Sequence, residues 1–126
     1  MLISKIRGYT FEMSPETFER LVSRSSHGLI KSIACVDGKI LVNGVKVKNI
    51  DDVIYSTETW ARVLGWAYGP VKRYWFKGNV KFKRIYWSIL GVFDYGMYKS
   101  LSVKDRVVVD VGAFVGDSAI YFALKG

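Results

Sequence analysis

The chain has 126 residues, of which half are apolar, and it carries a formal net charge of +8 with a sequence pI near 9.6. This composition excludes a disordered chain, and no apolar run approaches the roughly 20 residues that a membrane-spanning helix needs. A single cysteine, Cys35, excludes an internal disulfide, and one cysteine with one histidine leaves too few ligands for a zinc site.

Charge and amide content add further expectations. A basic chain suits nucleic acid or other anionic partners, and it also suits a piece of a longer protein whose acidic half is missing. The sequence has no Gln and few Asn beside abundant Lys, Arg and Val, which is typical of thermophilic proteins. Because the N-terminus lacks the apolar core of a signal peptide, we expect a cytoplasmic protein.

The first hundred residues predict an α+β region with a small antiparallel sheet and helices. Residues 1–13 show no clear period and predict a short strand or an irregular arm. Ser14 as N-cap and Pro15 at the first helical position predict a helix that ends near Ser25. Its apolar residues fall at i, i+3 and i+4, which predicts one buried face. They are Phe18, Leu21 and Val22.

After this helix the pattern changes to strands. Gly28 suits a left-handed helix cap, and we expect His27 to be a helix-end residue rather than a catalyst. The next segments predict an antiparallel meander joined by two-residue turns. Its strands are residues 29–36, 40–42 and 45–48, and its turns are Asp37-Gly38 and Asn43-Gly44. A second helix then starts at Ser56 or Thr57, with Trp60, Val63 and Leu64 on its apolar face.

Residues 71–87 interleave cations with aromatic side chains. The cations are Lys72, Arg73, Lys77, Lys81, Lys83 and Arg84. Gly78-Asn79 predicts a hairpin turn between strands 72–77 and 80–87. Single-stranded nucleic-acid binders place phosphates on such cations and stack bases on such rings. The favoured alternative is a half-buried hairpin whose aromatic residues face the core and whose cations face water.

The last part of the chain carries the strongest pattern. Residues 107–109, all valine, predict a strand that is buried on both faces, as in a parallel sheet. Asp110 ends this strand, and a glycine turn follows that closes at Gly116. Residues 119–125 then predict a helix with an N-cap from Asp117-Ser118. Strand, acidic residue, glycine loop and helix are the opening of a nucleotide-type α/β fold.

The spacing of the glycines excludes two phosphate-binding motifs. A dinucleotide fingerprint needs a glycine where Phe114 stands, and a P-loop needs a longer loop and a lysine where Asp117 stands. The remaining pattern, V-V-D-V-G-A-F-V-G-D-S-A-I-Y-F-A, resembles motif I of the class I S-adenosylmethionine-dependent methyltransferases. It is most similar to the FkbM-type group, whose motif reads roughly D-x-G-A-N-x-G-D, with Phe114 where Asn is usual.

The resemblance implies a Rossmann-like fold and S-adenosyl-L-methionine as the cofactor. The residues that it places at the cofactor are Asp110, Gly112, Ala113, Phe114 and Gly116. The Asp110 carboxylate would meet the cofactor ammonium, glycines would let the backbone approach, and the helix N-terminus would meet the ligand carboxylate. The family often methylates a hydroxyl oxygen and has a tyrosine near the cofactor edge. Tyr95 or Tyr98 could take that place, although packing against a helix is the commoner fate of such residues.

The resemblance begins near Phe93 and divides the chain into an N-terminal region, residues 1–100, and the start of a cofactor-binding domain, residues 101–126. We expect the N-terminal portion of a longer enzyme, or a short relative, that is inactive alone and has no catalytic residue to name. Because a lone β-loop-α unit cannot bury its own strand, self-association through the exposed sheet edge is expected.

The alternative is a non-enzymatic domain that binds nucleic acid or protein through residues 71–87; a third is that the chain alone binds neither ligand. The salt dependence of binding distinguishes the cofactor-binding hypothesis from the nucleic-acid hypothesis. Affinity for phosphates falls steeply as the salt concentration rises, whereas affinity for a nearly neutral cofactor changes little.

Overall fold

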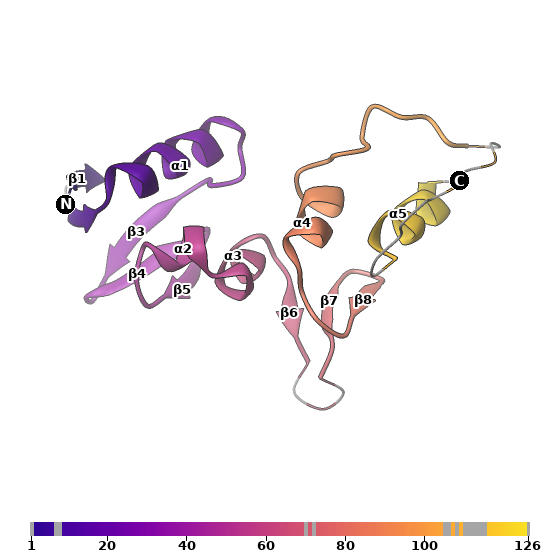
Figure 1. Cartoon of the computed structure of the whole chain (residues 1–126). Coiled ribbons are helices and arrows are strands. Elements are labelled where there is room, and N and C mark those ends of the chain that lie inside the picture. The colour runs from indigo at the N-terminus through magenta and orange to yellow at the C-terminus, as the bar shows by residue number, and fades with distance from the viewer. Residues whose placement is uncertain are drawn as a thin grey trace. The chain divides into compact units, whose positions relative to one another are not determined.

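A computed structural model gives the fold and describes residues 2–6, 9–69, 71, 73–104, 107, 109 and 116–125 (Figure 1). The described chain is α+β, as predicted, and it divides into two compact units, Met1–Ile85 and Tyr86–Gly126. The described residues include no helix that is long and apolar enough to cross a membrane. The predicted boundary between residues 100 and 101 concerns the start of a cofactor-binding domain and stays a prediction.

Three antiparallel sheets and three helices make up the described part of the first unit. In chain order they are β1 (Leu2–Ile6), β2 (Tyr9–Met13), α1 (Pro15–Ser26), β3 (Ile33–Val36), β4 (Lys39–Val42), β5 (Val45–Val47), α2 (Asp52–Tyr55), α3 (Thr57–Val63), β6 (Ala67–Tyr68), β7 (Trp75–Lys77) and β8 (Val80–Phe82). The sheets are β1-β2, β3-β4-β5 and β6-β7-β8.

The N-caps of α1 and α3 lie where the sequence predicted them. The Ser14 hydroxyl accepts a hydrogen bond from the Thr17 N–H at 3.1 Å, and the Ser56 hydroxyl accepts one from the Thr59 N–H at 3.2 Å. Such caps satisfy N–H groups that have no partner inside the first helical turn. Nδ1 of His27 lies 2.7 Å from a carbonyl oxygen of its own helix, so the helix-end role expected for this residue is confirmed.

Helix α1 turns a different face to the core from the predicted one. Leu21 is buried as expected, but Phe18 and Val22 are exposed. Thr17 and Arg24 lie beside Leu21 instead. The Thr17 hydroxyl donates to the N-cap carboxylate of α2 at 2.9 Å, and the Arg24 guanidinium donates to an α2 carbonyl at 2.6 Å. Because these two polar bonds fix the rotation of the helix, the apolar spacing alone gave the wrong face.

The meander β3-β4-β5 is confirmed, with both predicted turns. Asp37 and Asn43 each have a φ of 51°, and each is followed by a glycine with positive φ. Two successive positive φ angles make the hairpin turn whose twist matches that of the flanking strands. The first strand is shorter than predicted, since β3 begins at Ile33 and residues 29–32 are irregular.

The side chain of Asn43 accounts for this irregular segment. Its Oδ1 accepts hydrogen bonds from the N–H groups of Lys31 at 2.6 Å and Ser32 at 3.3 Å. Its Nδ2 donates to the carbonyls of Leu29 at 2.8 Å and Val63 at 3.3 Å. The Asn43 amide thus bonds backbone groups of residues 29–32 that a longer strand would have paired with its neighbour. Its bond to Val63 also connects the meander to the end of α3.

The core of the first unit includes three indoles. Trp60 is fully buried on α3, Trp66 is buried directly before β6, and Trp75 is buried on β7 of the third sheet. Around them lie apolar side chains from the meander and the short helices. These include Val42, Val47, Ile50, Val53, Ile54, Ala61, Val63 and Phe82.

The basic hairpin is shorter than predicted and gains a third strand. Strands β7 and β8 pair across the expected Gly78-Asn79 turn, and β6 adds on the other side of β7. The second strand ends at Phe82, not at Trp87; residues 83–86 are irregular, and Trp87 starts a helix. The strand predicted for residues 80–87 therefore extended too far, up to the first residue of a helix.

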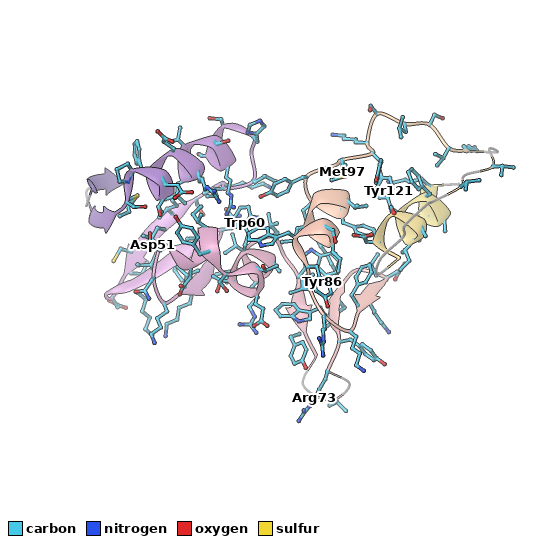
Figure 2. The ribbon with its side chains drawn as sticks, in the orientation of Figure 1. Asp51, Trp60, Arg73, Tyr86, Met97 and Tyr121 are labelled. Atoms are coloured by element: carbon cyan, nitrogen blue, oxygen red, sulfur yellow. The ribbon has the colours of Figure 1, made fainter. Side chains whose placement is uncertain are left out.

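The described part of the second unit holds two helices, α4 (Trp87–Phe93) and α5 (Asp117–Lys125), which contact each other. Rings from both helices and from the segment between them gather there, with Tyr121 of α5 shown in Figure 2. The centroid of Tyr121 lies 5.8 Å from that of Phe93, and Tyr98 lies 4.9 Å from Phe122. This aromatic cluster holds the two helices together.

Candidate functional site

Four of the five predicted cofactor-binding residues, Asp110, Gly112, Ala113 and Phe114, lie outside the described residues. The fifth, Gly116, directly precedes α5 and has a φ of 78°, which favours glycine because other residues are strained there. Its carbonyl accepts the Ile120 N–H at 2.9 Å and so begins the helix. The predicted helix is thus found, but it starts two residues earlier, so Asp117 and Ser118 lie in its first turn and not at the N-cap. The rest of the predicted glycine turn, residues 112–115, lies outside the described residues.

The buried strand predicted before the glycine turn is wrong for its described residues. Val107 is 95 % exposed and Val109 is 81 % exposed, and neither lies in a strand. A strand of this kind needs neighbours on both edges and cover on both faces. The three described sheets pair only among β1–β8, so they offer this valine run no partner. The Rossmann-like unit therefore stays a prediction.

The sequence predicted Asp117 only as a helix-capping residue. Its burial in the structure was not expected. The residue is 6 % exposed, and its Oδ1 accepts the Ser118 N–H at 2.8 Å. No donor within the described part of the chain reaches its Oδ2. A buried carboxylate oxygen without a partner is costly, since it gives up water and gains nothing in exchange. The signal in the sequence was an acid directly after the last glycine of the loop, in apolar surroundings.

The two tyrosines proposed for the cofactor edge differ in surroundings. Tyr98 packs on α5, with its ring centroid 4.9 Å from that of Phe122 and 6.2 Å from that of Tyr121. Tyr95 is exposed. Packing against a helix, the commoner fate of such residues, is confirmed for Tyr98.

The basic hairpin is half-buried, as the favoured alternative predicted, but not all of its aromatic residues face the core. Trp75 and Phe82 face each other across β7 and β8 and are buried, as in a half-buried hairpin. Tyr74 and Phe76 stay 43 % and 39 % exposed, and the exposed Lys81 is the cross-strand partner of Phe76. One face of the sheet therefore presents aromatic rings and a cation together.

The predicted cations of this hairpin are not equivalent. Lys72 lies outside the described residues, and the Nζ of Lys77 donates to the Leu64 carbonyl at the end of α3, at 2.7 Å. Arg73, in the connection between β6 and β7, is exposed with a φ of 51° (Figure 2). Lys83 and Arg84 are exposed after β8.

In the described segments, no three His, Cys, Asp or Glu side chains form a group that could hold a metal ion. Comparison with known proteins gives no match, whether to family models, to curated proteins or to solved structures. The methyltransferase resemblance therefore rests on the motif residues themselves.

Proposed function

We propose that this chain is the cofactor-binding start of an S-adenosylmethionine-dependent methyltransferase of FkbM type, acting by methyl transfer to an acceptor oxygen. The observation that carries the proposal is the junction of Gly116 with α5. There a left-handed glycine leads directly into a helix, as the motif requires. The expected cytoplasmic location belongs to the same proposal.

The described residues fit this cofactor at one atom. Oδ2 of Asp117 is buried and lacks a donor among the described residues, which suits a ligand that brings a positively charged donor. When bound, S-adenosylmethionine supplies a methyl group activated by its sulfonium. Asp110 and the loop glycines would bind and orient it, and orientation is the main contribution that such enzymes make to the rate.

Calorimetric titration with S-adenosylmethionine at low and high salt tests this proposal. We expect micromolar binding that changes little with salt and is lost in Asp110→Ala. The matched control is Asp37→Ala, which removes the same charge from an exposed turn of the first unit. Absence of binding to the unaltered chain would refute cofactor binding by this chain.

A second candidate is single-stranded nucleic-acid binding on the face of β6-β7-β8 that carries Phe76 and Lys81, termed the outer face. It is favoured by the exposure of Tyr74 and Phe76 with Lys81 opposite Phe76. Stacking on such rings contributes about 1–3 kcal/mol per base. Anisotropy of a labelled oligothymidine would fall steeply with salt if this candidate holds, and Phe76→Ala would weaken binding more than an exposed apolar change such as Val71→Ala.

A further inference from the structure

Helix α5 begins with the carboxylate of Asp117, whereas the resemblance predicts that this helix end meets the carboxylate of the ligand. Asp117 is the first residue of this nine-residue helix, and its carboxylate already takes the Ser118 N–H. A second carboxylate placed there would face like charge at short range. A group with N–H donors and positive charge would instead supply what Oδ2 lacks.

We infer that Asp117 also binds the ammonium group of the bound amino-acid moiety, with Oδ2 as acceptor, in addition to the contact expected from Asp110. The inference rests on the proposed function, since it names the part of S-adenosylmethionine that this site reads. The inference adds Asp117 to the expected cofactor-binding residues. It also places the first turn of α5 at the ammonium of the ligand instead of at its carboxylate.

Two properties of the site support this assignment over a purely structural role. A carboxylate in the first turn of a helix needs only one oxygen to accept a backbone N–H, and Oδ1 already accepts that of Ser118 at 2.8 Å. Oδ2 is buried in a residue that is 6 % exposed, so bulk water does not hydrogen-bond to it. Burial of Oδ2 without a hydrogen-bond partner does not stabilise the described part of the chain. It does leave an acceptor ready for an N–H donor of a ligand.

Four ligands separate the charged groups. S-adenosylmethionine and S-adenosylhomocysteine carry both ammonium and carboxylate, decarboxylated S-adenosylmethionine keeps only the ammonium, and methylthioadenosine has neither. For the unaltered chain we expect the first three to bind within a few-fold of one another. Methylthioadenosine should bind at least about tenfold more weakly, the loss expected for one hydrogen bond to a charged group.

The decisive variant is Asp117→Asn, which keeps the Oδ1 acceptor for Ser118 and removes the charge. We expect affinity for the three ammonium ligands to fall at least about tenfold and affinity for methylthioadenosine to stay unchanged. Asp117→Glu keeps the charge and should recover part of the loss. Asp37→Asn, with the same charge change in an exposed turn, should behave as the unaltered chain. Circular dichroism of each variant shows whether it is folded.

The outcomes distinguish this inference from the proposed function. If the unaltered chain binds S-adenosylmethionine and Asp117→Asn binds it equally well, the inference is wrong and the cofactor assignment stands. If decarboxylated S-adenosylmethionine binds as weakly as methylthioadenosine, the helix end reads the carboxylate and the inference is again overturned. If no ligand binds the unaltered chain, both fail together.

Discussion

The guanidinium of Arg24 lies over the indole of Trp60, with Cζ 4.3 Å from the ring centroid. The same guanidinium donates from Nη1 to the Val53 carbonyl at 2.6 Å. One side chain of α1 thus contacts both short helices that follow the meander, and it does so beside a fully buried ring. A cation over a desolvated ring is worth more than one at the surface.

Replacing Arg24 with alanine should therefore lower the free energy of unfolding by about 2–3 kcal/mol, from the lost ring contact and the lost charged hydrogen bond. Urea unfolding measures this change. The control is Arg20→Ala on the same helix, which removes an exposed ion pair with Glu16 and should cost about 0.5 kcal/mol or less. Equal losses in the two variants would contradict the assigned role of Arg24.

Asn43 combines a left-handed backbone with four side-chain hydrogen bonds, and two substitutions separate these contributions. Asn43→Gly keeps the backbone conformation and should cost about 1–3 kcal/mol through the lost bonds. Asn43→Ala should cost about 1 kcal/mol more, because alanine is strained at positive φ. Thermal unfolding of both variants measures the difference.

The matched control for Asn43 is Asp37→Gly. Asp37 has the same φ of 51° in the neighbouring turn, is exposed, and makes no side-chain hydrogen bond with the described residues. We expect this variant to unfold within about 0.5 kcal/mol of the unaltered chain. A loss as large as that of Asn43→Gly would mean that the turn itself, and not the amide network, carries the stability.

Local signals predicted the elements that begin or end at caps and turns. Ser14, Ser56 and the two hairpin turns act within a few residues of sequence, so their outcome does not depend on the rest of the fold. The orientation of α1 could not be predicted in this way. It depends on bonds from Thr17 and Arg24 to residues 34 and 29 positions away along the chain.

The same difference between local and long-range interactions explains which features of the candidate site were predicted. Gly116 and α5 are local features, because a left-handed glycine and an acidic first turn suffice to start a helix. The strand expected at Val107 and Val109 needs partners from elsewhere, and no described strand supplies them. The buried Oδ2 of Asp117, which has no hydrogen-bond partner among the described residues, also could not be predicted from the sequence. Burial and hydrogen-bond partners are properties of the folded chain.

Two lysines of the basic hairpin should respond in opposite ways to substitution. Lys77→Ala removes the bond to the Leu64 carbonyl and should lower stability by about 0.5–1 kcal/mol, with little effect on oligothymidine binding. Lys81→Ala should leave stability unchanged. If the outer face binds single strands, it should also reduce the slope of log affinity against log salt by about 0.7, as for one lost phosphate contact. Identical salt slopes in both variants would argue against binding on this face.

Tyr98 should control the local stability of α5. Tyr98→Ala removes the ring contacts to Tyr121 and Phe122, each worth about 0.5–1.5 kcal/mol beyond buried area. We expect amide hydrogen exchange in residues 117–125 to speed up by about 10-fold or more. Leu101→Ala truncates an exposed apolar side chain of the same unit and should leave exchange unchanged. Unaltered protection in Tyr98→Ala would show that α5 is held by other contacts.

The distribution of indoles gives the two units different optical signatures. Trp60, Trp66 and Trp75 are buried in the first unit, whereas Trp87, the fourth tryptophan of the sequence, is exposed at the start of α4. We therefore expect most of the tryptophan emission of the native protein to come from the three buried indoles of residues 1–85. A red shift on heating or in denaturant reports the opening of that unit almost alone, and the second unit can unfold while the emission maximum hardly moves.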